Sequence, residues 1–341
     1  MTHYAGLDVS LKETAICVVD KAGSVVWEGK VGTTIETIAS AVTRHAPKLE
    51  RVGMETGQIA VWLSHGLRDA GMPVDCIHAR RAAAALTLQA KKTDRNDARG
   101  LAQLVRSGWY EAVPMKSIAT HRIRAILVAR DQLVRMCTAL INKIRGLGKT
   151  FGVIIDAGKG ASFDRAVRNA LPHDPIVRDL LESLLETLTL LRERKRRFDR
   201  QLHRIARENA TCRQLMGAPG VGPLTAVAFA SAIEDPSRFR RTSDVGAYLG
   251  LTPTRYQSGE VNIGGRISKC GDRLTRRLLF EAATVILYRT GGALGLRTWA
   301  ERLVARSGSW KARVALARKL ATTLFRMMRD GTEFENRPHP A

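Results

Sequence analysis

The sequence predicts a mixed α/β domain at the N-terminus followed by a largely helical remainder. Three observations lead to this fold class. Short runs rich in β-branched residues alternate with helical spacings over residues 1–110. Two later stretches repeat apolar residues every seven positions, as long packed helices do. A tight glycine-containing turn then separates two further helical stretches within residues 215–233.

The N-terminal elements follow the order β-β-β-α-β-α-β-α. Three antiparallel strands are expected at residues 4–10, 14–20 and 24–31, and two further strands at 51–55 and 73–78. Helices are expected at 34–46 and 58–71, and a last helix lies within 91–105. This order is the topology of RNase-H-like (RuvC-like) domains. A doubly wound nucleotide-binding fold is the alternative, but no glycine-rich loop follows the first strand.

The heptad stripes predict a long coiled-coil hairpin. The first stripe runs over residues 118–147 and the second over 181–205, with a glycine-rich insertion at 148–175 between them. Packing within one chain and packing between subunits both fit this pattern. The charged run at 192–200 either faces solvent or lies along phosphates.

The C-terminal part is expected to be mainly helical. Its turn at Pro219–Gly222 resembles a helix-hairpin-helix, in which backbone N–H groups and a helix N-terminus contact a nucleic-acid phosphate, although a plain αα turn looks similar. A glycine-rich loop around Ser258 and a basic helix are expected to follow. The predicted domains are therefore 1–110, 111–209 and 210–341.

The charge predicts a polyanionic partner. The 341 residues include 55 Lys+Arg and 32 Asp+Glu, a formal charge of +23. Residues 1–110 carry 14 basic and 11 acidic side chains, net +3, so residues 111–341 carry net +20. Nucleic acid is favoured over an acidic membrane surface. No apolar run approaches the ~18 residues of a membrane span and no signal peptide is evident, so a cytoplasmic protein is expected.

Four acids form a candidate metal site. Asp8 lies in an apolar strand, Glu55 ends a strand, and Asp94 and Asp97 are one helical turn apart. Carboxylate oxygens suit Mg²⁺, with Mn²⁺ as the alternative, and two such ions can clamp a phosphoryl transfer. Simpler roles are open for three of the acids: a helix cap for Asp94, a turn for Asp8 and an ion pair with Arg51 for Glu55. The five cysteines are scattered and are expected to be reduced and buried, and no Cys/His spacing suits zinc.

The chain resembles a known family over nearly its whole length. The resemblance rests on the motifs GLDVS, GMETG, KTDRNDA, LMGAPGVGPLTA, YLGLTP and SGEVNIGGRISKCGDRLTRRLL, in this order. Together they are similar to the DEDD transposases of bacterial insertion sequences, the IS110 family, whose characterised members are RNA-guided bridge recombinases. The resemblance implies a RuvC-like domain that binds metal through Asp8, Glu55, Asp94 and Asp97. It also implies a C-terminal transposase domain whose serine nucleophile is Ser258.

The same resemblance implies a mechanism and partners. Ser258 would attack a DNA phosphodiester to form a phosphoserine, and strand exchange and rejoining would follow. A structured guide RNA would select donor and target DNA by pairing, and a homo-oligomer, dimer or tetramer, would form through the long helices. From the residues alone Ser258 is more simply a loop serine, and Ser268, closer to Lys269, is the second candidate.

Basic residues near both groups are candidate phosphate contacts, namely Lys91, Lys92, Arg95, Arg266, Lys269, Arg273, Arg276 and Arg277. Three other functions are open. A RuvC-type structure-specific DNA nuclease would use the four acids alone. An actin-like small-molecule kinase also carries a GxDxS first strand. A non-catalytic nucleic-acid scaffold gives no reason for the four acids.

Overall fold

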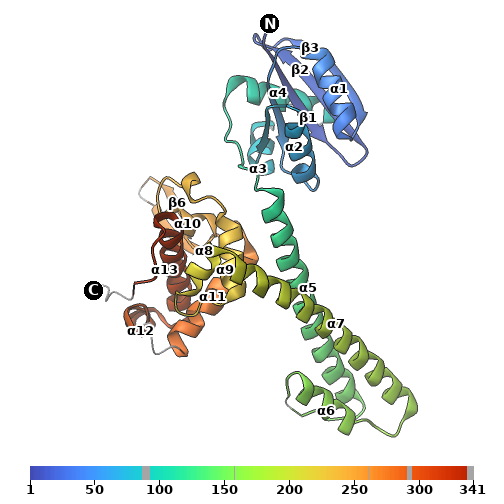
Figure 1. The fold of residues 1–341 in the computed structure, drawn as a ribbon, viewed down its shortest axis with the longest axis vertical. Helices are drawn as coiled ribbons and strands as arrows, with labels where there is room; N and C mark the ends of the chain where they lie inside the picture. Colours follow the sequence, from blue (N-terminus) through green and yellow to red (C-terminus); the bar gives the residue numbers. More distant parts are fainter. Residues whose placement is uncertain (87–92, 157, 260, 290–293, 336–341) are drawn as a thin grey trace. The chain divides into compact units, whose positions relative to one another are not determined.

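The computed structural model describes residues 1–86, 93–156, 158–259, 261–289 and 294–335 (Figure 1). The chain divides into two compact units, Met1–Ile118 and Ala119–Ala341. The second unit contains both the long helices and the C-terminal elements, so the further boundary expected near residue 209 stays a prediction. Within the described residues no helix is long and apolar enough to cross a membrane.

The first unit is a five-stranded mixed sheet with helices, as the sequence predicts. The strand order is β3-β2-β1-β4-β5, with β1–β3 antiparallel and β4 and β5 parallel to β1. The strands are β1 (His3–Val9), β2 (Glu13–Asp20), β3 (Val25–Gly32), β4 (Leu49–Glu55) and β5 (Val74–Ile77), and the helices are α1 (Ile35–His45), α2 (Ala60–Asp69), α3 (Ala79–Leu86) and α4 (Asp94–Ser107). Helix α3 was not expected from the sequence. The finer RuvC-like assignment stays a prediction.

The central strands of the sheet are buried on both faces. Successive side chains of a strand point to opposite faces, and the core residues divide in this way. Leu7 and Ile16 pack with Ile38 of α1 and Leu63 of α2 on one face. On the other face, a second cluster joins β2 to α4 through Ala15, Cys17, Val19, Ala98 and Ala102. Burial on both faces explains why β2 is almost continuously apolar.

Helix α4 lies directly on the backbone of β1. A Cβ atom built on Gly6 would lie 2.1 Å from the carbonyl oxygen of Ala98 and 2.3 Å from the amide nitrogen of Ala102. Both contacts are backbone atoms of α4, so no side chain can move aside. Gly6 therefore sets how closely, and at which residues, α4 crosses the sheet.

Replacing Gly6 with alanine should destabilise the first unit by about 2–3 kcal/mol, because the added methyl group overpacks a rigid contact. The change is measured as a lower melting temperature in calorimetry of the full chain. Gly32→Ala is the matched control, because no atom lies within 4 Å of a Cβ built there. Equal melting temperatures for the two variants would show that α4 can shift away from β1.

The second unit begins with two long helices, α5 (Ile118–Thr150) and α7 (Pro175–Glu208), joined through α6 (Ala161–Asn169). They run antiparallel. Leu127 near the start of α5 shares a hydrophobic cluster with Leu202 near the end of α7, and Ile144 shares another with Leu181. Arg130 of α5 donates to Asp199 of α7 at 2.9 Å. The heptad stripe thus marks residues that pack, while supercoiling of the pair stays a prediction.

The remaining elements form a mainly helical body around α9, of which eight residues are buried. They are α8 (Ala210–Met216), α9 (Pro223–Ile233), the 3₁₀ helix η1 (Pro236–Arg238), α10 (Asp244–Tyr248), β6 (Pro253–Ser258), β7 (Val261–Ile267), α11 (Arg273–Tyr288), α12 (Leu294–Ser307) and α13 (Ser309–Asp330). The helix, turn and helix expected over residues 215–233 are present as α8, the turn and α9.

The expectation of a glycine-rich loop around Ser258 is wrong. Strands β6 and β7 pair antiparallel as a hairpin, with Ser258 opposite Val261. The glycines suggested a loop, but β-branched and aromatic residues such as Thr254, Tyr256 and Ile263 favour strands. A second expectation also fails: four of the five free cysteines are buried, but Cys270, just beyond the hairpin, is exposed.

Candidate metal centre and nucleic-acid interface

Two of the four predicted metal ligands end neighbouring parallel strands. In the register of β1 and β4, Leu7 lies opposite Met54. Asp8 and Glu55 follow these residues, so they occupy corresponding positions at the carboxyl ends of the two strands. Both carboxylates are half-buried and line one cavity of 310 Å³. The structure therefore brings Asp8 and Glu55 together although 46 residues separate them in the chain.

Helix α4 brings the other two acids to the same end of the sheet. Near its end, Arg106 donates to the carbonyl of Lys21, beside the turn between β2 and β3. At its start, Asp94 binds Lys30 near the other end of β3. The helix therefore runs antiparallel to β1, and its first turn, with Asp94 and Asp97, lies where β1 and β4 end.

Lys30 connects Asp94 to the sheet. Across the strands Lys30 is opposite Ala15, and Ala15 is opposite Asp8, so their side chains share a face. The Lys30 Nζ atom lies 2.6 Å from Asp94 Oδ2. This ammonium group holds the pKa of Asp94 below its usual range. Asp94 in turn raises the pKa of Lys30, and the more distant charges of Glu13 and Asp8 act in the same direction.

The arrangement suits a hard cation, although the four acids do not form a ready ligand set. Among the described residues, no three His, Cys, Asp or Glu side chains are grouped closely enough to share one metal ion. Asp94 nevertheless already binds a cation, the ammonium of Lys30. Thr93, not Asp94, caps α4, because its hydroxyl accepts the N–H of Asn96. The capping role considered for Asp94 is therefore wrong.

The basic residues near these four acids differ from one another in their contacts. Lys91 and Lys92 lie outside the described residues. Arg95 and Arg99 both bind Glu28 of β3. Burial raises the pKa of Glu28, but the hydrogen bonds from Arg99 and Arg95 outweigh it and hold that pKa below the usual range. Arg95 therefore ties α4 to the sheet, and phosphate binding by Arg95 stays a prediction.

Ser258 lies at the tip of a hairpin. It is the last residue of β6, and Gly259 after it has a φ of 55°, a left-handed conformation that glycine adopts readily. The alternative serine, Ser268, follows β7 at the base of the hairpin, where its N–H donates to the carbonyl of Thr252. The two candidates thus occupy opposite ends of the hairpin.

The basic residues around the hairpin fall into two groups. Arg266, Lys269 and Arg273 are exposed. Arg276 donates to the carbonyls of Leu249 and Cys270 at 2.9 and 2.8 Å, and Arg277 binds Asp131 and Glu281. Arg276 therefore ties α11 to the segments before it, and Arg277 ties α11 to α5. A phosphate contact by either arginine would be made in addition to this structural role.

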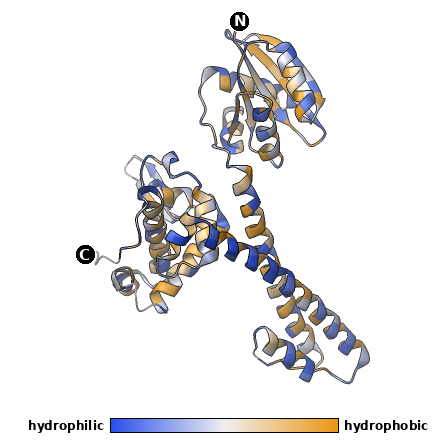
Figure 2. Cartoon of the chain, viewed as in Figure 1, coloured by the Kyte–Doolittle hydropathy of each residue, from blue (hydrophilic) through white to orange (hydrophobic). Residues whose placement is uncertain are grey.

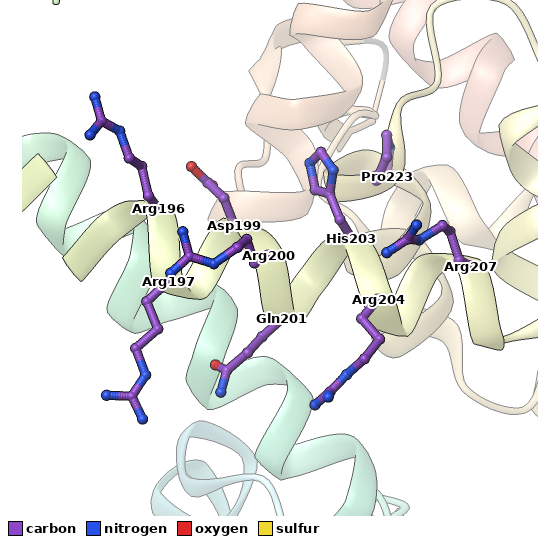
Figure 3. A pocket seen from close by; sticks show the side chains of 9 residues that line it. All are labelled: Arg196, Arg197, Asp199, Arg200, Gln201, His203, Arg204, Arg207 and Pro223. Atoms are coloured by element: carbon purple, nitrogen blue, oxygen red, sulfur yellow. The ribbon is translucent and has the colours of Figure 1, made fainter. Parts of the chain in front are cut away.

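A basic groove outside the phosphate contacts predicted from the sequence lies along α7. It has a volume of 820 Å³ and is lined by residues of α7 and by Pro223, hereafter the α7 groove (Figure 3). Five exposed arginines of α7 line it, Arg196, Arg197, Arg200, Arg204 and Arg207, and Figure 3 shows Arg196 extending to one side of the helix and Arg197 and Arg204 to the other. Figure 2 shows this part of α7 as strongly hydrophilic.

The arginines of the α7 groove are not neutralised by acids. In the described part of the chain none of the five forms an ion pair. The one acid that lines the groove, Asp199, binds Arg130 and Lys195. A helix face that only meets solvent usually mixes both signs of charge. Five unneutralised guanidinium groups on one segment favour the second interpretation of this run, contact with phosphates.

Comparisons with known proteins point to one family. The model of a DEDD transposase family named for IS110 matches residues 5–150, and that of the transposase IS116/IS110/IS902 family matches residues 212–296. The transposase for insertion sequence element IS1111A of Coxiella burnetii is 27% identical over 95% of this chain and 88% of its own length. A probable family 20 transposase of Pseudomonas aeruginosa is 30% identical over 70% of this chain and 72% of its own length. The matched regions include all four acids and Ser258.

Proposed function

The chain belongs to the IS116/IS110/IS902 family of transposases and is an enzyme that acts on DNA, and from this premise we propose a mechanism with two sites. Ser258 in the second unit carries out strand cleavage, exchange and rejoining, guided by a structured RNA, and the carboxylates of the first unit would hold a divalent metal that supports phosphoryl transfer. The observation that carries this proposal is the placement of Asp8, Glu55 and the first turn of α4 at one end of the sheet.

Asp8, Glu55, Asp94 and Asp97 are the residues that would hold Mg²⁺, or Mn²⁺ as the alternative. When bound, the metal neutralises charge on the reacting phosphate and polarises its P–O bonds. Other residues of the first unit position these carboxylates. Gly6 allows α4 to approach β1, and Lys30 keeps Asp94 ionised and directed toward the sheet.

Ser258 supplies the nucleophile. Its Oγ forms a bond to a DNA phosphorus, the P–O bond to the leaving deoxyribose oxygen breaks, and the serine proton passes to that oxygen. The phosphodiester energy is retained in the phosphoserine, so the reverse reaction with another strand end rejoins DNA without hydrolysis. The position of Ser258 at the tip of the β6–β7 hairpin supports this role, because a hairpin tip can reach a DNA backbone.

A homo-oligomer and a guide RNA complete the proposal. Apolar residues lie exposed on the long helices, including Val128 (55%) and Met136 (40%) of α5 and Leu190 (50%) of α7. We place the proposed subunit interface on these helices, where these side chains would become buried. The strongly basic remainder, net +20 over residues 111–341, favours binding of polyanions, and both the DNA and the guide RNA of this proposal are polyanions.

The α7 groove should contribute to nucleic-acid affinity. The double variant Arg200→Ala/Arg204→Ala should weaken binding of a 30-bp duplex. The steepness of the fall of log K with log salt should decrease by about 1–2, because binding then neutralises fewer phosphates and releases fewer counterions. Fluorescence anisotropy at several salt concentrations measures both. The control Arg168→Ala/Arg178→Ala removes equal charge from exposed positions outside the groove. Equal losses in both variants would show that only net charge matters.

The whole proposal is tested by incubating the protein with Mg²⁺, donor and target DNA and RNA transcribed from the flank of its element. A covalent protein–DNA adduct on a denaturing gel, mapping to Ser258 and dependent on RNA, is the expected result. Metal-dependent cleavage without an adduct would favour the RuvC-type nuclease. The comparisons give no support to the small-molecule kinase.

A further inference from the structure

A second groove in the same unit combines aromatic and basic side chains. It has a volume of 1340 Å³ and lies between the base of the β6–β7 hairpin and one face of α13. The hairpin contributes Pro253 and Gly265, and α13 contributes residues that recur every fourth position, Trp310, Val314, Arg318 and Thr322. We refer to it as the Trp310 groove.

Trp310 presents a large aromatic surface in a defined orientation. The side chain is 71% exposed. Phe280 of α11 stacks on it, with ring centroids 5.7 Å apart and 17° between planes, and the Arg313 guanidinium lies 4.3 Å from the Trp310 ring centroid. An exposed indole that its neighbours hold in place can stack on a planar ligand with little loss of side-chain entropy.

The rim of the groove is uniformly positive. Five cations line it, Arg266, Lys269, Lys311, Arg318 and Lys319, and its described lining contains no acid. Lys319 is half-buried, with Nζ 4.3 Å from the ring centroid of Trp299. Burial, together with the charge of Arg326, lowers the pKa of Lys319. A partly buried ammonium without a carboxylate partner is a group that a bound anion would stabilise.

We propose that the Trp310 groove binds single-stranded DNA, with an unpaired base stacked on Trp310 and the adjoining phosphates on the cations of the rim. Base–aromatic stacking next to a basic track is how proteins bind single strands without sequence preference. A duplex cannot use the indole, because its base faces are already stacked. A protein partner is disfavoured, because an aromatic contact for protein would not need five cations and no acid.

The dimensions suit a short segment. Lys311 and Arg318 are seven residues apart on α13, about 10 Å at 1.5 Å per residue, so the two side chains can contact different phosphates of one short strand. From Pro253 at the base of the hairpin to its tip is five residues, about 17 Å. A strand displaced near the tip could therefore continue into the groove. The proposal itself does not require Ser258 to be the nucleophile, because binding alone tests it.

The test measures binding of fluorescein-labelled oligonucleotides to the full chain by anisotropy. The probes are a 12-nucleotide single DNA strand, its duplex, the same strand with abasic sites, and the RNA of the same sequence. Trp310→Ala should weaken single-strand binding about tenfold and leave duplex and abasic binding within twofold, because only stacking is lost. Trp310→Phe should keep most of the affinity, which guards against a folding effect. Lys311→Ala/Arg318→Ala should weaken intact and abasic strands alike.

Trp109→Ala is the matched control, since Trp109 is 73% exposed but belongs to the first unit. Unchanged single-strand affinity in Trp310→Ala, or equal loss in Trp109→Ala, would overturn the assignment. Tighter binding of RNA than of DNA would overturn the choice of DNA. A changed sedimentation mass with unchanged oligonucleotide binding would assign the groove to self-association instead.

Discussion

Replacing Ser258 with alanine should abolish the protein–DNA adduct and reduce strand exchange by about ten-thousandfold or more, the scale seen when a covalent nucleophile is removed. Alanine lacks the oxygen that forms the bond to phosphorus, and the geometry proposed here offers no second serine at the hairpin tip. DNA binding should persist, because the basic surfaces are unchanged. Quantitative gel analysis of adduct and joined product measures the effect.

Ser268→Ala is the control for this experiment, because Ser268 lies at the base of the same hairpin. It should retain the adduct. If Ser258→Ala kept full strand exchange and Ser268→Ala lost it, the nucleophile would be Ser268. If Ser258→Ala kept metal-dependent cleavage at the wild-type rate, the enzyme would be a hydrolytic nuclease of RuvC type.

Replacing Asp97 with asparagine should reduce recombination by about a thousandfold, because it removes a ligand charge while keeping side-chain size. The amide leaves less negative charge to hold a divalent cation beside Asp8 and Glu55. The rate should be measured as a function of Mg²⁺ concentration, and the half-saturating concentration should rise. Undiminished recombination in Asp97→Asn would sink the metal hypothesis for this acid.

Metal binding can also be measured without turnover. Electron paramagnetic resonance of added Mn²⁺ reports the bound fraction directly, and that fraction should fall in Asp8→Asn and Asp97→Asn. Asp69→Asn serves as the control, since Asp69 is an exposed acid at the end of α2. Loss of recombination with unchanged Mn²⁺ binding would assign Asp97 a role other than metal ligation.

Much of the first unit follows from local patterns. Its strands and its first two helices lie where periodicity places them, since a half-buried strand or an amphipathic helix is marked by its own residues. Asp8 and Glu55 were identifiable because an acid inside or at the end of an apolar strand is unusual. The hairpin that carries Ser258 was missed, because its glycines outweighed the strand-forming residues between them.

Partners that are distant in the chain could not be predicted. Lys30 and Asp94 are 64 residues apart, and no local pattern links them. Arg95 and Arg277 remain predicted phosphate contacts, and the fold also gives them Glu28 and Asp131 as ion-pair partners, which no local pattern indicates. The charged run of α7 was open to two interpretations, a solvated face or contact with phosphates, and only the ion-pair network of Asp199 shows that the arginines of the α7 groove are left unneutralised among the described residues.

The sequence by itself determined the family, the mixed α/β unit, the basic remainder and the residues that can do chemistry, because motifs, periodicity and charge are properties of the chain. Only the tertiary structure determines which of these residues lie close to one another. It placed α4 against Gly6, paired Lys30 with Asp94, put Ser258 at a hairpin tip and assembled the Trp310 groove from three segments of the chain. The physical reason is that long-range contacts depend on how buried surfaces pack, and that information is spread over the whole chain.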